Sequence, residues 1–275
     1  MKSYAYAKLN LALKILGQRP DGYHELDMIM QRISLCDELT IQKQAALTVS
    51  SDLPLPAENT MTRAAQVFFE YTGITGGANI AVKKNIPAEA GLGGGSSDGA
   101  AVLAALNELY GTKLRLEELL ALGQKVGADV PFFIMGACAR ATGTGEILSA
   151  IKNKLDCVYL LAKPVKGVST KDAYKGFHTA GGMPVDIDGT VASLASGDLR
   201  RFSKTSGNDL MPAALRLCPD IGRILYELKD ADAAFMTGSG SCVFGVYGNK
   251  KTAHANMERL RFLSFVDFVY VAENK

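Results

Sequence analysis

The stretch that decides the fold lies in the first half of the chain and reads Pro87-Ala88-Glu89-Ala90-Gly91-Leu92-Gly93-Gly94-Gly95-Ser96-Ser97-Asp98-Gly99. Glycine accepts positive φ angles, so this backbone can curl tightly and turn several N–H groups towards one anion. The Ala- and Leu-rich stretch Gly99–Leu109 that follows predicts a helix, whose N-terminal end attracts negative charge. These residues therefore predict a phosphate-binding loop that leads into a helix.

The loop does not match three well-known phosphate loops. A Walker A loop needs a lysine directly after its glycines, and Ser96 follows them here. Protein kinases need the H-R-D and D-F-G motifs, and the chain has neither. The Rossmann spacing G-x-G-x-x-G fails because Ser96 occupies the position of the third glycine. A flexible glycine linker is a further alternative, although linkers are rarely placed between a hydrophobic strand and a regular helix.

The remaining sequence predicts an α+β protein. Leu9, Leu11, Leu13 and Ile15 alternate with polar or small residues, which predicts a half-buried strand over Lys8–Ile15. Asn59 is placed to cap a helix that Gly73 ends. Further strands are predicted at Leu35–Ile41, Leu47–Ser50, Asn79–Lys84, Cys138–Thr142, Cys157–Ala162, Ala233–Met236, Cys242–Tyr247 and Phe265–Val271, and further helices at Leu116–Val126, Thr170–Phe177, Asp209–Leu217 and Ile221–Leu228. We place a domain boundary between residues 153 and 154, giving domains 1–153 and 154–275.

Composition narrows the class of protein. The chain has 275 residues, 48% of them hydrophobic, and a formal net charge of +2, with no long basic block to bind nucleic acid. No apolar run is long enough for a membrane span, and the N-terminus resembles neither a signal peptide nor a transit peptide. The scattered cysteines suggest reduced, buried thiols. We expect a soluble cytoplasmic protein with small-molecule partners, no nucleic acid and no membrane, as a monomer or homodimer.

Three elements of the chain resemble those of the GHMP kinases. They are the strand that carries Lys8, the loop over residues 87–97, and the glycine turn Met236-Thr237-Gly238-Ser239-Gly240-Ser241-Cys242-Val243-Phe244-Gly245. The pair Ala88-Glu89 departs from the family's loop pattern, and residues 181–206 match no motif. The resemblance implies a two-domain GHMP kinase fold, with an N-terminal half like domain 2 of ribosomal protein S5 and a C-terminal α/β half. It also implies that the chain uses ATP, accompanied by Mg²⁺.

Other segments resemble one GHMP subfamily. They are Ala7-Lys8-Leu9-Asn10-Leu11, Gly17-Gln18-Arg19-Pro20-Asp21-Gly22-Tyr23-His24-Glu25-Leu26, Gly127-Ala128-Asp129-Val130-Pro131-Phe132-Phe133, and Val168-Ser169-Thr170 with Tyr174. Members of this subfamily phosphorylate the 2-hydroxyl of 4-diphosphocytidyl-2-C-methyl-D-erythritol with ATP, in the non-mevalonate route to isoprenoid precursors. The resemblance implies the same transfer here.

The resemblance also implies roles for individual residues. Asp129 would be the catalytic base and Lys8 its partner. Tyr23 and Tyr174 would stack on the cytosine, His24 and Lys8 would read its edge, and Asn10 would hold the methylerythritol. The nucleotide would be bound by Asn59, Lys84, Pro87, Ala88, Glu89, Ala90, Gly91, Leu92, Gly93, Gly94, Gly95, Ser96 and Ser97, and the substrate also by Gly238, Ser239 and Gly240. The metal ligands are not identified.

Structural alternatives exist for several of these residues. Asp129 could merely cap the next turn, Tyr174 could be a core aromatic residue, and a mid-strand lysine such as Lys8 usually faces solvent. Two alternatives exist for the whole chain: another GHMP kinase acting on homoserine, mevalonate or a sugar, and an RNA-binding protein with the ribosomal fold. The absence of basic clusters interleaved with aromatic residues argues against RNA binding.

Overall fold

The computed structural model describes residues 1–275, and the chain divides into two compact units. The first unit comprises residues 1–7, 35–86 and 93–136, and the second comprises 8–34, 87–92 and 137–275. Each unit is therefore assembled from separated segments. The boundary at 153/154 expected from the sequence falls inside the second unit and stays a prediction.

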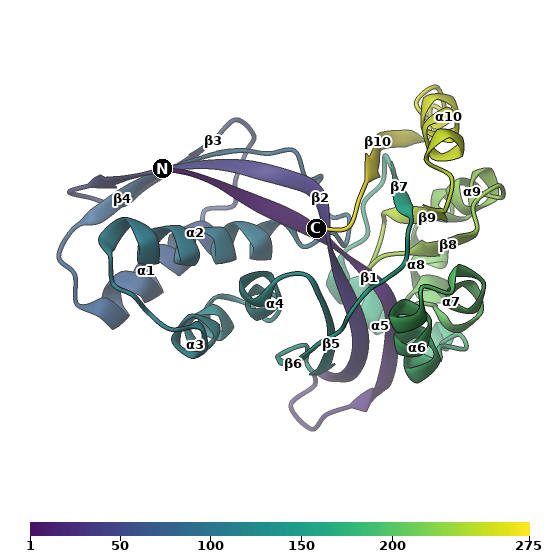
Figure 1. Cartoon of the computed structure of the whole chain (residues 1–275), viewed down its shortest axis with the longest axis horizontal. Coiled ribbons are helices and arrows are strands. Elements are labelled where there is room, and N and C mark those ends of the chain that lie inside the picture. Colours follow the sequence, from purple (N-terminus) through teal and green to yellow (C-terminus); the bar gives the residue numbers. More distant parts are fainter. The chain divides into compact units, whose positions relative to one another are not determined.

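The first unit packs helices against a small sheet. Strand β4 pairs in parallel with β3 and antiparallel with the second part of β2. Figure 1 shows α1 and α2 side by side along these strands. Helix α1 begins at the cap Asn59 and ends at Gly73, as the sequence predicted. The elements with residues in this unit are β1 (Lys2–Gln18), β2 (His24–Gln44), β3 (Thr48–Ser51), α1 (Thr60–Thr72), β4 (Gly77–Lys83), α2 (Gly94–Tyr110), α3 (Leu116–Val126) and α4 (Val130–Met135).

The second unit contains the first part of β2, paired antiparallel with β5, and a separate sheet of order β10-β7-β9-β8. Its elements are β5 (Cys138–Gly143), β6 (Ile147–Ala150), β7 (Val158–Pro164), α5 (Thr170–Ala180), α6 (Ile187–Ser196), α7 (Leu199–Thr205), α8 (Met211–Leu217), α9 (Asp220–Glu227), β8 (Ala233–Met236), β9 (Val243–Tyr247), α10 (Lys250–Leu260) and β10 (Val266–Ala272). The mixture of helices and sheets confirms the predicted α+β class.

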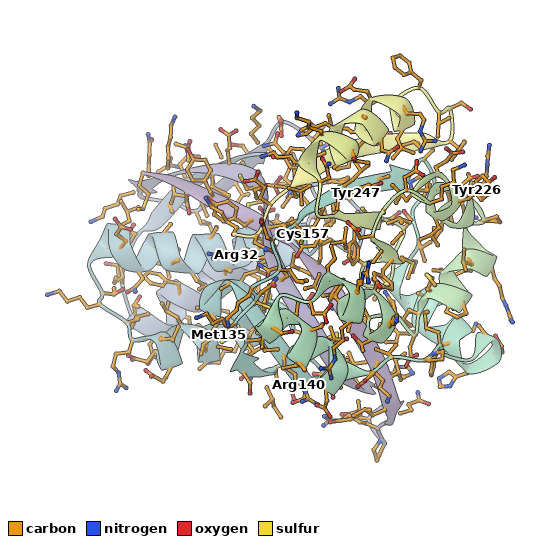
Figure 2. The ribbon with its side chains drawn as sticks, turned by 45° about the vertical axis from the view of Figure 1, so that its right-hand side comes forward. Arg32, Met135, Arg140, Cys157, Tyr226 and Tyr247 are labelled. Atoms are coloured by element: carbon orange, nitrogen blue, oxygen red, sulfur yellow. The ribbon has the colours of Figure 1, made fainter.

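Aromatic side chains fill the core of the four-stranded sheet. Tyr159 on β7 and Phe244 on β9 are fully buried, and their rings meet edge to face at 6.2 Å. Tyr247, at the end of β9, is buried as well, whereas Tyr226 on α9 is 69% exposed; both are labelled in Figure 2. The core of this unit is therefore built on β7 and β9.

Several elements differ from the sequence predictions in extent. Strands β1 and β2 are longer than predicted, and both extend into exposed polar residues, at Gln18 and Gln44 respectively. Helix α2 begins at Gly94 instead of Gly99, so the last glycines of the loop already form its first turn. Residues 181–206, which matched no motif, contain α6 and α7, and each helix begins at an aspartate cap, Asp186 or Asp198.

The sequence predicted that one side of β1 faces solvent, and this prediction was wrong. Every residue from Ala7 to Leu13 is buried, and Lys14 is the first exposed residue after them. Leu9 and Leu11 lie on one face of β1, and Lys8 and Asn10 lie on the other. Both faces are covered. Two buried polar side chains in mid-strand need partners, and these two contact each other, while Asn10 also contacts Met28 on β2.

The cysteines carry free thiols, as predicted. Cys138, Cys218 and Cys242 are buried, whereas Cys36 and Cys157 are half-buried. None of the helices combines the length and the apolar character that a membrane span requires.

Candidate active site

In the second unit, the first half of the glycine loop lies against the C-terminal glycine turn. The Ser241 N–H donates to the Glu89 carbonyl at 3.2 Å, and the Cys242 N–H donates to the Ala90 carbonyl at 3.3 Å. The Thr237 hydroxyl also donates to the Gly91 carbonyl at 3.4 Å. Two segments that are about 150 residues apart therefore form one backbone surface.

Strand β1 brings Lys8 and Asn10 to this surface. The Lys8 N–H donates to the Leu92 carbonyl at 3.0 Å, and the Asn10 N–H donates to the Thr237 hydroxyl at 2.9 Å. The Lys8 ammonium donates to the Asn10 side-chain oxygen, and the Asn10 amide contacts the Met28 sulfur at 3.4 Å. Lys8 is 4% exposed and Asn10 2%. The second unit thus brings together the strand that carries Lys8, the first part of the loop (residues 87–92) and the glycine turn.

The backbone contacts require glycine at position 91 and favour it at position 238. A Cβ on Gly91 would lie 2.2 Å from the Thr237 carbonyl oxygen, and one on Gly238 would lie 3.0 Å from the Gly91 oxygen and 3.2 Å from the Lys8 ammonium. Both residues also adopt positive φ, +71° and +57°. The close backbone approach beside Lys8 therefore depends on these two glycines.

Asn208 braces the glycine turn from behind. Its side-chain nitrogen donates to the Met236 and Gly238 carbonyls, each at 2.8 Å, and its side-chain oxygen accepts from the Leu210 N–H at 2.9 Å. The Thr170 hydroxyl, at the start of α5, lies 2.9 Å from the Ser239 hydroxyl. The turn is held in place from two directions.

In the first unit, the N-terminus of α2 offers unsatisfied donors. Gly93 is the N-cap in a left-handed conformation and has no side chain to cap the helix. The first N–H groups of the helix, beginning at Gly94, therefore point out of the helix end, where the helix dipole also favours an anion. This arrangement is suited to phosphate.

Ser96 and Ser97, which have the same role in the sequence prediction, differ in burial and in hydrogen bonding. Ser97 is 2% exposed, and its hydroxyl donates to the Tyr6 carbonyl at 2.6 Å. Ser96 is half-buried, and its hydroxyl faces Gly127, two residues before Asp129. Ser97 therefore anchors the helix to β1, which leaves Ser96 as the better phosphate donor of the two.

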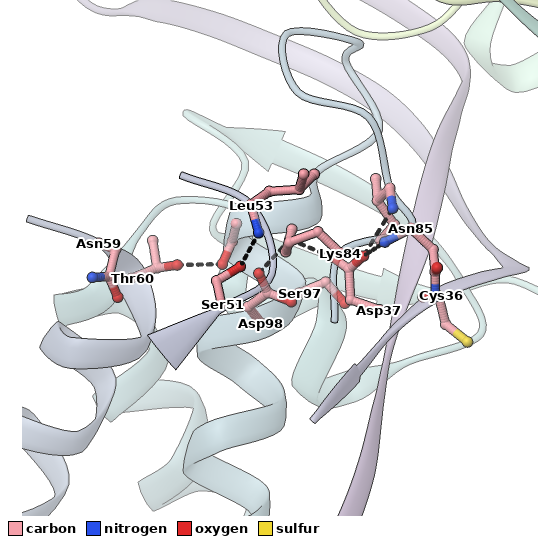
Figure 3. A network of polar contacts seen from close by, with 12 residues as sticks. Cys36, Asp37, Ser51, Leu53, Asn59, Thr60, Lys84, Asn85, Ser97 and Asp98 are labelled. Carbon is pink, nitrogen blue, oxygen red and sulfur yellow. Dashed lines mark hydrogen bonds and ion pairs between the residues drawn. The ribbon is translucent and has the colours of Figure 1, made fainter. Parts of the chain in front are cut away.

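A buried charge cluster lies beneath the helix end (Figure 3). Lys84 forms ion pairs with both Asp37 and Asp98, the second at 2.5 Å. Asp37 also accepts from the backbone N–H groups of Asn85 and Ile86 at 2.6 and 2.8 Å. A Cβ on Gly94 would lie 3.6 Å from the Lys84 ammonium, so the cluster supports the first turn of α2.

The cluster carries more negative than positive charge. Burial, opposed by the charge of Lys84 and reinforced by that of Asp37, raises the pKa of Asp98 to about 7. Burial lowers the pKa of Lys84, but the two carboxylates outweigh this effect and raise it above its ordinary value. One oxygen of Asp98 is buried without a hydrogen-bond partner. The ammonium of Lys84 is therefore engaged structurally, and its expected place beside adenine stays a prediction.

Asn59 has a structural role as well. Its side-chain oxygen accepts from the Thr62 N–H at 3.0 Å and caps α1. Its neighbour Thr60 donates its hydroxyl to the Gly95 carbonyl in the phosphate loop. Helix α1 thus holds the loop through Thr60, and an adenine contact by Asn59 is untested.

Asp129 lies at the N-cap position of α4 but makes no capping hydrogen bond with its side chain. Asp129 is half-buried. Along the chain it follows Gly127 and Ala128 and precedes Val130, Phe132 and Phe133, which are buried. The capping alternative for this aspartate therefore lacks the contact that it requires. Asp129 and Lys8 belong to different units, so their predicted pairing stays a prediction.

Residues expected to bind the base gather at the start of β2 and on α5. The rings of His24 and Tyr174 stack with centroids 4.9 Å apart and an angle of 29°. Tyr174 is half-buried, whereas the core position of α5 belongs to Ala173. Tyr23 is 67% exposed. A planar aromatic surface therefore exists at this place.

Sequence reasoning missed the supporting roles of Asp37, Asp98 and Asn208. Asp98 could have been noticed, because an aspartate directly after the serines falls inside an otherwise apolar helix. The others had no signal, since their partners are distant in sequence. No group of three or more His, Cys, Asp or Glu side chains is arranged to hold a metal ion.

Comparisons with known proteins agree with the three elements. Residues 59–137 match the family described as GHMP kinases N terminal domain, and residues 190–262 match GHMP kinases C terminal. A protein of Pelotomaculum thermopropionicum named 4-diphosphocytidyl-2-C-methyl-D-erythritol kinase is 40% identical over 265 residues, covering 94% of this chain and 92% of that protein. A protein of the same name from Bacillus cereus is 38% identical, covering 97% and 94%.

Solved structures give the same result. The crystal structure of a 4-(cytidine 5'-diphospho)-2C-methyl-D-erythritol kinase superimposes with a TM-score of 0.84 at 32% identity, covering 100% of both chains. A homoserine kinase from Cytophaga hutchinsonii reaches a TM-score of 0.77 at 20% identity, covering 100% of this chain and 94% of that one, which reports a shared fold.

We predict that Gly91→Ala separates the glycine loop from the glycine turn. The new methyl group would overlap the Thr237 carbonyl oxygen in a backbone conformation that alanine resists. We expect a loss of about 2–5 kcal/mol in the free energy of unfolding, together with weaker ATP binding. Gly95→Ala is the control for stability, because its Cβ meets nothing closer than 3.6 Å. Equal melting temperatures for the two variants would contradict the close approach.

We predict that the stability of the Asp98→Asn variant, relative to that of the parent, increases as the pH rises. The folded-state pKa of Asp98, about 7, lies above its ordinary value of 3.8, so its ionised form opposes folding above pH 7 and this opposition fades as the pH falls. The melting temperature of the variant relative to the parent should therefore increase between pH 5 and pH 8. Asp230→Asn, on an exposed turn, controls for net charge. A difference that stays constant across this range would contradict the assignment.

Proposed function

The chain belongs to the GHMP kinase family, and on this basis we propose that it transfers the γ-phosphoryl group of ATP to the 2-hydroxyl of 4-diphosphocytidyl-2-C-methyl-D-erythritol. The products are ADP and the 2-phosphate, an intermediate of the non-mevalonate route to isoprenoid precursors. Relatives of this name cover nearly the whole chain, which supports the acceptor as well as the reaction class. We place the enzyme in the cytoplasm.

The observation that carries the proposal is the junction of the glycine loop with the glycine turn beside Lys8. It places a buried ammonium next to a surface of backbone that only glycine can form. Phosphoryl transfer depends mainly on positioning and on stabilising negative charge, and such a surface provides both. The N–H groups of α2 add donors for the nucleotide phosphates.

We assign the chemical step to two side chains. Asp129 accepts the proton of the acceptor hydroxyl while the hydroxyl oxygen bonds to the γ-phosphorus and the bond to the β–γ bridging oxygen breaks. Lys8 counters the negative charge of the transferring group, and its bond to Asn10 fixes its direction. Mg²⁺ is proposed to arrive with the nucleotide, held mostly by phosphate oxygens and water.

The remaining residues serve binding. Ser96 is the proposed hydroxyl donor to the phosphates, while Ser97 holds the helix. Tyr23, His24 and Tyr174 are proposed to receive the cytosine, since a heterocycle offers a flat face for stacking and an edge for hydrogen bonds. Asn10 is proposed to contact the methylerythritol.

A coupled assay for ADP tests the acceptor. The purified chain should release ADP with 4-diphosphocytidyl-2-C-methyl-D-erythritol and not with homoserine, mevalonate or galactose, each offered separately. Mass spectrometry of the product should show one added phosphoryl group. Turnover with another of these acceptors alone would assign a different GHMP kinase activity.

Asp129→Asn tests the base. The amide is nearly isosteric but cannot accept the proton, so we expect the turnover rate to fall by about 10²–10⁴-fold while the dissociation constant of ATP stays near that of the parent. Stopped-flow or isothermal titration separates the two quantities. Near-normal turnover under saturating substrates would exclude Asp129 as the base.

A further inference from the structure

Helix α5 turns one aromatic face towards the start of β2. Tyr174, Phe177 and His178 are spaced i, i+3 and i+4, which places them on the same side of the helix. All three rings surround His24: Tyr174 stacks on it at 4.9 Å, Phe177 meets it edge-on at 6.3 Å, and the His178 ring lies 5.3 Å away. Only His24 and Tyr174 were expected at this place from the sequence.

The contact between the two histidines is polar. Their Nε2 atoms lie 3.4 Å apart, within hydrogen-bonding range. A neutral imidazole carries its proton on one nitrogen only, so one ring donates through Nε2 and the other accepts. If both rings were fully protonated, both Nε2 atoms would be donors and the contact would be repulsive. A hydrogen bond between these two atoms therefore needs at least one neutral ring.

We propose that His178 is a positioning residue of the acceptor site, which fixes the ring orientation and the tautomer of His24 through this hydrogen bond. The inference rests on the proposed function, in which His24 reads the edge of the cytosine. The edge of a cytosine offers both donors and acceptors. A histidine that recognises this edge must therefore present a nitrogen whose role, donor or acceptor, is fixed. Because His178 occupies Nε2 of His24, only Nδ1 of His24 is left to contact the base. The tautomer decides whether Nδ1 donates or accepts a hydrogen bond, and a change of tautomer would reverse that role.

Charges around His24 favour the neutral form. Burial, and then the charge of His178, lower the pKa of His24 below its ordinary value of 6.5. The titratable groups that face it from α5 are Tyr174 and His178. On its own segment, Asp21 and Glu25 are both paired with Arg19. The neutral form of His24 therefore persists below pH 6.5 and is lost as the pH falls through its lowered pKa.

The test compares His178→Phe with His178→Gln across pH 5–9. Phenylalanine keeps the ring and removes the hydrogen bond, so the Michaelis constant for the cytidylated acceptor should rise by about 2- to 10-fold at pH 8, with that for ATP unchanged. Glutamine restores a polar group that does not titrate, so it should raise the constant less. Thr179→Ala is the matched control, because the Thr179 hydroxyl bonds back to the Gly176 carbonyl of its own helix.

The pH profile separates positioning from packing. In the parent, the acceptor constant should rise on the acidic side as His24 is protonated. In His178→Gln this inflection should move to higher pH, because the charge that lowers the pKa of His24 is gone. A purely structural role would change the melting temperature without moving the inflection. An unchanged acceptor constant and inflection in both variants would overturn the proposal.

A measurement without turnover keeps the inference separate from the proposed function. Nuclear magnetic resonance of ¹⁵N-histidine-labelled protein reports the tautomer and the titration of His24 directly. His178→Gln should raise the titration midpoint of His24 and change its tautomer populations. If the parent fails to phosphorylate the cytidylated acceptor, the proposed function fails, whereas His24 signals identical in parent and variant would refute the pairing.

Discussion

The arrangement of Lys8, Asn10 and the glycine turn in the second unit depends on one constraint, the close approach of the Gly91 backbone to the Thr237 backbone. No side chain fits between them, since a Cβ on Gly91 would lie 2.2 Å from the Thr237 oxygen. Because the approach is made, the Asn10 N–H reaches the Thr237 hydroxyl and Lys8 lies against Gly238. A lysine in mid-strand can be buried only where such partners exist. The glycines therefore determine where the ammonium is placed.

In the first unit, charge has a comparable role. Asp37 and Asp98 share the single ammonium of Lys84 directly beneath the first turn of α2. Two carboxylates share one cation, which leaves an excess of negative charge when both are ionised. Burial of Asp98, opposed by the charge of Lys84 and reinforced by that of Asp37, raises its pKa to about 7. An excess of this kind opposes a second anion nearby, so the orphan N–H groups of α2 must provide the attraction for phosphate. The cluster holds the helix end, and the N–H groups are the proposed phosphate donors.

The acceptor side is built differently, from aromatic rings rather than from glycine backbone. Tyr174, Phe177 and His178 come from one helix and surround His24, which comes from the start of β2. Stacking tolerates any flat heterocycle, whereas hydrogen bonds to a base edge discriminate. Selectivity for a cytidylated acceptor would then depend on the protonation of a histidine pair. The proposed phosphate site and the proposed base site thus use different chemistry, backbone N–H groups in one and aromatic rings in the other.

The sequence alone determined the α+β class and most helices and strands, because these follow from local patterns: alternation, caps, and glycines next to a helix. The three kinase elements were recognised by their resemblance to the GHMP kinases. The sequence could not show that both faces of β1 are covered, that α2 begins at Gly94, or that Ser97 is anchored while Ser96 is not. Asp37, Asn208 and His178 were equally invisible, since each acts on a partner far away in sequence. Only tertiary structure decides such pairs, because burial and hydrogen bonding depend on neighbours in space, which periodicity along the chain does not encode.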